Sequence, residues 1–268
     1  MKVQNNIKSI AIGSFDGIHI AHQALIERAE AVVVIERNGG YLTPGYKRTS
    51  YTDKPCYFYH FDKIRSLAPE AFVAKLEADF PALEKIVVGY DFSFGRERAG
   101  NGTVLTALFH EEVEIVSEVC YEGIPVHSRT IRACLREGNI ALANSLLGRY
   151  YSMEGYVIRG QGLGKKALVP TLNLHVEHYQ LPLEGVYATR TKIGTQWFDS
   201  ISFLGHRVTT DGSYAVESHI LGREVGETKG ELQLEFRGFI RKNRKFDSLF
   251  QLKEQIEKDI EHAKQFLT

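Results

Sequence analysis

The sequence has few of the features that mark secreted, metal-binding or membrane-spanning chains. Its three cysteines, Cys56, Cys120 and Cys134, lie far apart and form no CxxC pair. This usage indicates neither a zinc site nor a disulfide framework, and it is typical of a reduced cytoplasm. The N-terminus lacks the apolar core of a signal peptide, and no apolar run approaches the roughly 20 residues that a membrane span needs. We therefore expect a cytoplasmic protein with no membrane partner.

The chain also lacks an excess of charge of either sign. Lysine and arginine total 33, as do aspartate and glutamate, so the formal net charge is zero. Nothing in this balance favours nucleic acid as a partner. The 268 residues, 43% of them hydrophobic, suffice for one or two domains with a core in each. The oligomeric state is not set by any pattern in the sequence.

The first half alternates strand and helix patterns. Continuous β-branched runs are typical of parallel strands buried on both faces. We expect strands at 7–12, 32–35, 86–88 and 113–116, and helices at 20–31 and from Pro69 onward. Two short helices follow, with Ser128 and Asn139 as the expected caps. This order predicts a Rossmann-like parallel sheet that binds ligands at the carboxyl ends of its strands.

After about residue 148 the pattern changes to short strands separated by glycine and proline. We expect strands at 155–158, 172–176, 186–193, 201–204, 214–221 and 232–236. These predict a small antiparallel β-barrel or sandwich, of which we favour the barrel. The chain ends in a helix whose apolar residues recur every three or four positions, with Ser248 and Gln251 forming a capping box. We expect two domains, 1–147 and 148–268.

The most informative stretch is 13–22, where the first strand passes into the first helix. Gly13 and Gly17 allow a tight turn and a close approach to a ligand. His19 and His22 are three residues apart, so they share one helical face and can donate hydrogen bonds to phosphate oxygens. The alternative is an ordinary strand-to-helix turn that carries two surface histidines.

This stretch resembles the GxFDGxHxGH signature of the HxGH nucleotidyltransferases. Segment 88–95 resembles a VGxDFxFG motif, 128–132 an SSTxIR motif, and 146–149 an LLGR motif. Together they are similar to the prokaryotic bifunctional riboflavin kinase/FAD synthetase family, over nearly the whole chain.

The resemblance implies that the first half adenylylates FMN with ATP, giving FAD and pyrophosphate. It implies that His19 and His22 contact ATP phosphates and that Asp91 lies near the FMN phosphate. Ser128 and Arg132 would hold the triphosphate tail. The residues implied to shape the nucleotide loop are Gly13, Phe15, Asp16 and Gly17.

The second half carries a glycine-rich stretch at 160–164, followed by Thr171 and Asn173. Backbone N–H groups at Gly160, Gly162 and Gly164 can face phosphates. Thr171 and Asn173 lie two residues apart on an expected strand and offer the oxygen donors that Mg²⁺ prefers. The stretch resembles the GxxLGFPTxNL signature of riboflavin kinases.

A second kinase signature is similar to segment 214–221. The resemblance implies that Glu217 orients and deprotonates the 5′-hydroxyl of riboflavin, and that the second half makes FMN from riboflavin and ATP. The implied partners are thus riboflavin, FMN, FAD and ATP, with Mg²⁺. Glu217 and His219 share a strand face, so the alternative is a half-exposed polar face.

Several positions depart from the family pattern. Ala21 replaces a glycine, Ser14 replaces an asparagine and Arg129 replaces a threonine. Segment 36–40 lacks an FxPHP stretch, and segment 200–209 lacks the proline of an NIGxxPT motif. These departures leave three alternatives open. They are an FMN adenylyltransferase with a degenerate kinase module, a non-catalytic flavin-binding regulator, and an enzyme that adenylylates pantetheine phosphate.

Overall fold

We analysed a computed structural model of the chain, which describes residues 6–37, 41–158, 169–209, 212–223 and 228–267. The chain divides into two compact units, Met1–Thr130 and Ile131–Thr268. None of the helices in the described ranges has the length and apolar character required to span a lipid bilayer.

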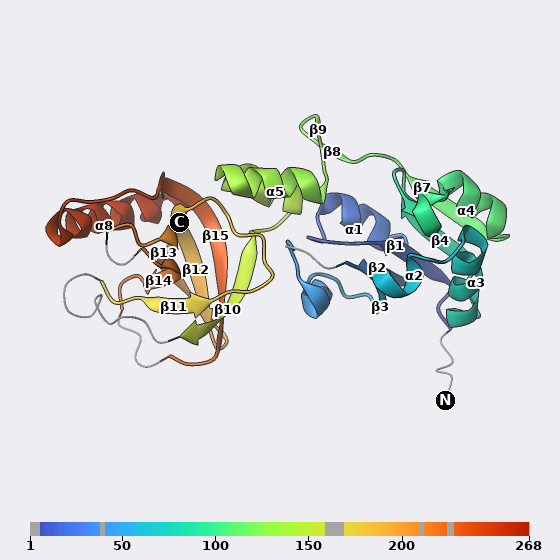
Figure 1. The fold of residues 1–268 in the computed structure, drawn as a ribbon, viewed down its shortest axis with the longest axis horizontal. Helices are drawn as coiled ribbons and strands as arrows, with labels where there is room; N and C mark the ends of the chain where they lie inside the picture. The colour runs from blue at the N-terminus through green and yellow to red at the C-terminus, as the bar shows by residue number, and fades with distance from the viewer. Residues whose placement is uncertain (1–5, 38–40, 159–168, 210–211, 224–227, 268) are drawn as a thin grey trace. The chain divides into compact units, whose positions relative to one another are not determined.

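The first unit is built on a five-stranded parallel sheet with the order β3-β2-β1-β4-β7 (Figure 1). Its strands are β1 (Ser9–Gly13), β2 (Ala31–Glu36), β3 (Cys56–His60), β4 (Lys85–Gly89) and β7 (Glu112–Val116). The chain runs outward from β1 to β3 and then returns to β4 on the other side of β1. The strand order therefore reverses between β1 and β4, where parallel sheets bind their ligands.

Helices cover both faces of this sheet. They are α1 (Ile20–Ile26), α2 (Phe61–Ile64), α3 (Pro69–Asp79) and α4 (Gly102–Leu108). On one face, Ile10, Val33 and Val88 pack in a core with Phe72 and Leu76 of α3. On the other face, alternate residues of the same strands pack against α1. This two-sided burial explains the continuous apolar runs in β1, β2 and β4.

Two short hairpins follow the carboxyl ends of β4 and β7 in the chain. One pairs β5 (Ser93–Phe94) with β6 (Gly100–Asn101), and the other pairs β8 (Cys120–Tyr121) with β9 (Ile124–Pro125). A 3-10 helix, η1 (Gly45–Tyr51), lies between β2 and β3, and a second, η2 (Arg96–Arg98), between β5 and β6.

The parallel sheet and four of its strands are confirmed, with three corrections. The helix expected at 20–31 ends at Ile26, because the chain must turn before Ala31 joins β2 beside Ile10. Strand β3 was not expected. Strand β7 is half-exposed instead of buried on both faces, because it lies at the edge of the sheet.

The second unit is a closed barrel with the strand order β10-β11-β14-β13-β12-β15 (Figure 1). Its strands are β10 (Ser152–Ile158), β11 (Leu172–His175), β12 (Gly185–Ile193), β13 (Gln196–His206), β14 (Tyr214–Ile220) and β15 (Glu231–Lys242). All pairings are antiparallel. Helix α8 (Leu249–Ala263), followed by η3 (Lys264–Phe266), contacts β12, β13 and β15. The barrel and its terminal helix are confirmed.

Two helices connect the sheet to the barrel in sequence, α5 (Ser128–Glu137) and α6 (Ile140–Leu147). The Asn139 side chain caps α6 by accepting a hydrogen bond from the N–H of Leu142, as expected. Ser128 is the first residue of α5, and its hydroxyl donates to the carbonyl of Asp16 at 2.7 Å, so its role as the cap of α5 stays a prediction. The Ser248 cap of α8 is confirmed, but Leu249 is 44% exposed and does not belong to the buried face of the helix.

Candidate active sites

The loop between β1 and α1 has an unusual backbone conformation. Phe15 and Ile18 adopt positive φ angles of 48° and 39°, and Gly17 has a φ of 98°. Non-glycine residues rarely adopt this region, and such conformations persist only where surrounding contacts hold them. Phe15 and Ile18 are fully buried, so packing holds this loop in addition to its polar contacts.

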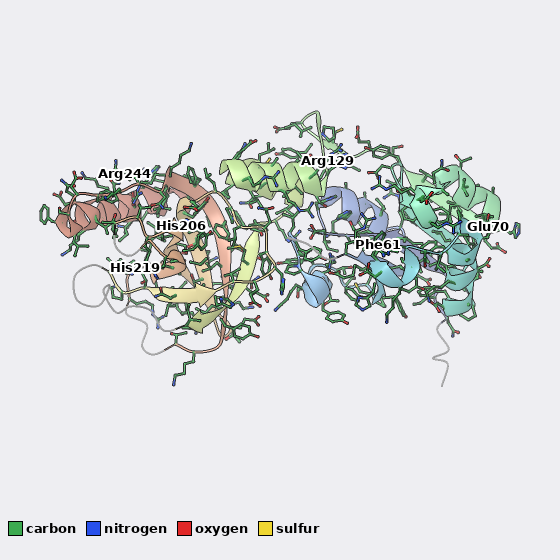
Figure 2. The ribbon with its side chains drawn as sticks, in the orientation of Figure 1. Phe61, Glu70, Arg129, His206, His219 and Arg244 are labelled. Carbon is green, nitrogen blue, oxygen red and sulfur yellow. The ribbon has the colours of Figure 1, made fainter. Side chains whose placement is uncertain are left out.

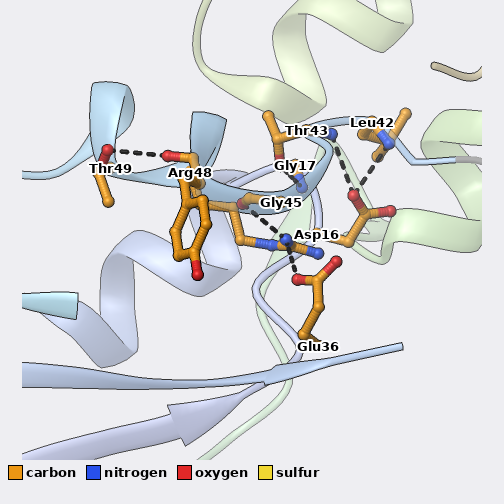
Figure 3. A network of polar contacts seen from close by, with 9 residues as sticks. Asp16, Gly17, Glu36, Leu42, Thr43, Gly45, Arg48 and Thr49 are labelled. Carbon is orange, nitrogen blue, oxygen red and sulfur yellow. Dashed lines mark hydrogen bonds and ion pairs between the residues drawn. The ribbon is translucent and has the colours of Figure 1, made fainter. Parts of the chain in front are cut away.

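Polar contacts from two other segments hold the loop (Figure 3). The buried carboxylate of Asp16 accepts hydrogen bonds from the N–H groups of Leu42 at 2.9 Å and Thr43 at 3.0 Å. The hydroxyl of Thr43 accepts the N–H of Gly17 at 2.8 Å. With the Ser128 hydroxyl on the carbonyl of Asp16, these contacts make Asp16 and Gly17 structural parts of the loop.

Beneath Thr43 lies a buried ion pair. The guanidinium of Arg48, which is fully buried, donates to the carboxylate of Glu36 and to the carbonyl of Gly45 at 3.0 Å (Figure 3). Arg48 thereby joins η1 to the end of β2. Sequence reasoning missed the supporting role of Thr43 and Arg48, because their contacts connect residues that lie well apart in the chain.

His19 and His22 lie together at the start of α1. Nδ1 of His19 accepts the N–H of His22 at 3.3 Å, so His19 is the cap of the helix. The two rings stack at 3.5 Å between centroids, and the ring of Phe15 meets His22 edge-on at 5.1 Å. Because Nδ1 of His19 is an acceptor, the neutral ring carries its proton on Nε2. The two imidazoles therefore lie side by side, as expected, but only His22 is on the helix, because His19 is the extended residue that precedes it.

A cavity of about 440 Å³ opens at the carboxyl ends of β1, β4 and β7. Six predicted site residues line it, namely Gly13, Phe15, His19, His22, Asp91 and Ser128. Asp91 is exposed and lies two residues beyond the end of β4. Arg132 lies on α5, four residues after Ser128, within the second unit. The cavity occupies the place where the strand order reverses, as the parallel-sheet topology predicts.

A polar cluster that sequence reasoning missed lies at the rim of this cavity. The phenol of Tyr90 donates to Glu118 at 2.6 Å and contacts Nε2 of His127 at 3.3 Å. The hydrogen bond to the Glu118 carboxylate raises the pKa of Tyr90 to about 12. Arg129, which Figure 2 shows at the start of α5, is also one of the residues that line the cavity. The sequence signal for this cluster was the departure at Arg129, which replaces a threonine in the SSTxIR-like segment.

The second candidate site is a cavity of about 180 Å³ in the barrel unit. Thr171, Asn173, Glu217 and His219 all line it. Asn173 of β11 is the direct partner of Glu217 on β14, which places the two side chains next to each other. Nδ1 of His219 donates to the carbonyl of Pro170 at 2.7 Å, which fixes the ring beside β11 (Figure 2). Gly160, Gly162 and Gly164 lie outside the described residues.

Arg207 contacts two of the predicted residues of the barrel site, Asn173 and Glu217. Sequence reasoning did not single it out. Its Nε donates to Oε1 of Glu217 at 2.7 Å, and its Nη2 lies 2.6 Å from the same oxygen. Nη2 also donates to Oδ1 of Asn173 at 2.6 Å, and Nη1 donates to the hydroxyl of Ser213 at 2.8 Å. One guanidinium therefore connects two residues to which different roles were assigned.

A buried ion pair forms another wall of the same cavity. Arg241 of β15 donates from Nε to both carboxylate oxygens of Asp259, at 3.0 and 2.9 Å. Asp259 is 3% exposed and also accepts from Gln255 at 2.8 Å. Because Asp259 belongs to α8 and Arg241 to β15, this pair attaches the terminal helix to the barrel.

Comparison with known proteins identifies both halves of the chain. A family model described as riboflavin kinase matches residues 147–267, and one described as FAD synthetase matches residues 50–130. A bifunctional riboflavin kinase/FMN adenylyltransferase of Listeria monocytogenes is 30% identical, and the match covers 97% of this chain and 92% of that protein. The protein of the same name from Escherichia coli K12 is 28% identical, with 96% and 92% covered.

A solved structure supports the fold over the same length. The crystal structure of a protein named macrolide-efflux protein, from Streptococcus pneumoniae, matches with a TM-score of 0.85 and 26% identity. The match covers 98% of this chain and 97% of that one. On the strength of the full-length relatives and of both family models, this chain belongs to the bifunctional riboflavin kinase/FMN adenylyltransferase family.

Proposed function

We propose that the chain makes FAD from riboflavin in two ATP-dependent steps, one at each cavity. Riboflavin is phosphorylated to FMN in the barrel, and FMN is adenylylated at the parallel sheet with release of pyrophosphate. The observation that carries this proposal is the presence, in one chain, of two separate sets of groups suited to these steps. Stacked histidines lie at the sheet cavity, and an oxygen-rich cluster around Glu217 lies at the barrel cavity.

In adenylyl transfer, a phosphate oxygen of FMN attacks the α-phosphorus of ATP, and the bond to the bridging oxygen of pyrophosphate breaks. His19 and His22 donate hydrogen bonds to the phosphates, and these bonds strengthen as negative charge moves onto pyrophosphate. The Nδ1 cap leaves the Nε2 proton of His19 as its donor. Ser128 and Arg132 hold the triphosphate tail, for which a guanidinium is well suited. Asp91, which lines the cavity, would lie near the FMN phosphate.

In the kinase step, the 5′-hydroxyl oxygen of riboflavin attacks the γ-phosphorus of ATP, its proton passes to Glu217, and ADP leaves. Thr171 and Asn173 would hold Mg²⁺ together with the ATP phosphates. Their neutral oxygens fit an ion that arrives with the nucleotide, and Asn173 Oδ1 already faces a cationic group in Arg207. When bound there, Mg²⁺ would neutralise phosphate charge and align the nucleotide for transfer.

We place the functional boundary between residues 147 and 148, although the chain packs as units that meet at residue 130. The difference concerns α5 and α6. Ser128, on α5, belongs to the sheet cavity, whereas Asn144, on α6, donates to the carbonyl of Phe236 in the barrel at 3.0 Å and accepts the N–H of Tyr151 at 2.7 Å. We infer that the two helices serve the first activity while they pack with the second unit.

The test is a product profile. Purified protein is incubated with Mg²⁺, ATP and either riboflavin or FMN, and the flavins are separated by chromatography. We expect riboflavin to give FMN and then FAD, and FMN to give FAD directly. FAD from FMN without FMN from riboflavin would show a degenerate kinase. Tight flavin binding without any product would overturn the proposal and favour a non-catalytic regulator. Turnover of pantetheine phosphate in place of FMN would also overturn it.

A further inference from the structure

Arg207 occupies the position between the proposed cation ligand and the proposed base of the kinase site. Its Nη2 lies 2.6 Å from both Asn173 Oδ1 and Glu217 Oε1. Two contacts with Ser213 fix the residue. Nη1 of the guanidinium donates to the Ser213 hydroxyl, and the backbone N–H of Arg207 donates to the carbonyl of Ser213 at 2.9 Å. Arg207 is thus fixed at the start of the β13–β14 connection and directed toward β11.

This arrangement creates a competition for a single oxygen. An amide oxygen has two lone pairs, but a divalent cation on one of them weakens a short hydrogen bond from a guanidinium on the other, because the two positive groups repel each other at that distance. The carboxylate of Glu217 differs, since it has two oxygens and both Nε and Nη2 of Arg207 contact the same one, Oε1. Arg207 can therefore release Asn173 and still hold Glu217.

We propose that Arg207 is a positioning residue of the kinase site that competes with the metal–nucleotide complex for Asn173 and orients Glu217. In the ligand-free site its guanidinium acts as the resident cation, keeping Asn173 and Glu217 together. Binding of the cation with ATP displaces Nη2 from Asn173, while Nε remains on Glu217 and directs the second carboxylate oxygen toward the hydroxyl of riboflavin. This inference rests on the proposed kinase function of the barrel.

The proposal predicts opposite effects on cation binding and on turnover. Arg207→Met keeps the length of the side chain and removes its charge and its donors. Because the ion no longer displaces a charge-assisted hydrogen bond, we expect this variant to bind Mn²⁺ in the presence of ADP roughly tenfold more tightly than the wild type. The kcat of riboflavin phosphorylation falls by about 10- to 100-fold, since Glu217 loses its orientation. Arg207→Lys keeps the positive charge and stays close to the wild type in Mn²⁺ affinity.

The measurement is Mn²⁺ titration with ADP followed by electron paramagnetic resonance, which needs no turnover. Arg190→Gln is the matched control, because Arg190 pairs with Asp199 at 3.2 Å on the barrel and does not line the cavity. FAD formation from FMN reports that the first unit of each variant is folded, and urea unfolding of each variant reports that the barrel is folded. Mn²⁺ affinity in Arg207→Met that is equal to or weaker than in the wild type overturns the proposal, as does an equal gain in Arg190→Gln. The absence of Mn²⁺ binding in both wild type and Arg207→Met also overturns it.

The outcome is separable from that of the proposed function. If the wild type makes no FMN from riboflavin, the kinase assignment fails whatever the Mn²⁺ titration gives. If the wild type makes FMN but Arg207→Met shows no gain in Mn²⁺ affinity, the kinase assignment stands and the role of Arg207 is refuted.

Discussion

Replacing Thr43 with valine tests whether the segment after β2 holds the nucleotide loop in its working shape. Valine has nearly the same shape as threonine but cannot accept the N–H of Gly17, a buried hydrogen bond of 2.8 Å. The loss of one such bond costs about 1–2 kcal/mol. The loop is sensitive to this loss, because Phe15 and Ile18 hold positive φ angles that cost on the order of 1–3 kcal/mol each.

A cost of about 1–2 kcal/mol corresponds to a 5- to 30-fold change in an equilibrium between ordered and opened loop. When the binding-competent state loses population, apparent affinity falls by the same factor. We therefore expect the KM for ATP in FMN adenylylation to rise by up to that factor, while riboflavin phosphorylation is unchanged. Steady-state kinetics of both reactions on one preparation measure the two effects.

The matched control is Thr49→Val. Thr49 lies in the same 3-10 helix region, but its hydroxyl donates to the carbonyl of Tyr46 at an exposed position, 2.8 Å away. This change should leave both activities within about twofold, as is usual for surface substitutions. If Thr43→Val has no more effect on adenylylation than Thr49→Val, the bond to Gly17 does not support the loop and the reasoning is refuted.

Four further changes probe the two cavities. His22→Ala should lower FAD formation from FMN by roughly 10²–10³-fold and spare FMN formation, because it removes one phosphate donor; an equal loss of both activities would contradict separate sites. Glu217→Ala should lower riboflavin phosphorylation by roughly 10²–10⁴-fold and leave FAD formation from FMN intact, and unaltered kinase activity would exclude a role as base. Asp259→Leu should destabilise the protein by about 3–5 kcal/mol in urea unfolding, because it leaves the charge of Arg241 in a partly buried site without its carboxylate. Tyr90 should ionise near pH 12, and the difference in phenolate absorbance between the wild type and Tyr90→Phe measures this. Because folding raises the pKa of Tyr90, its contribution to the stability of the folded protein is present below pH 10. That contribution disappears as the pH rises through 12.

Much of the first unit could be predicted because its signals are local. The runs in β1, β2 and β4 are apolar at every position, since both faces of these strands are covered. Strand β3, with the sequence CYFYH, escaped prediction because its half-buried aromatic residues do not form such a run. It is recognisable only through its parallel pairing with β2, which is a tertiary contact.

The histidine pair was predictable for the same reason. Its residues lie within ten positions of Gly13, and their relative placement follows from a strand, a turn and the start of one helix. The residues that support the loop are not local. Gly17 and Thr43 are 26 positions apart, and Asp16 and Ser128 are 112 apart. Both contacts involve backbone groups, so residue types gave no sign of them.

The barrel site shows why a motif can predict residues and still miss how they interact. Asn173 and Glu217 belong to separate sequence motifs and carry separate predicted roles, one as cation ligand and one as base. Strand pairing makes them direct neighbours, because β11 and β14 are adjacent in the barrel order although two strands lie between them in sequence. A carboxylate and an amide oxygen brought this close form an electronegative pair, and Arg207 enters from the β13–β14 connection to neutralise it. The place of this arginine beside the two oxygens therefore follows from the barrel topology. A cation that binds Asn173 has to displace the guanidinium from that oxygen.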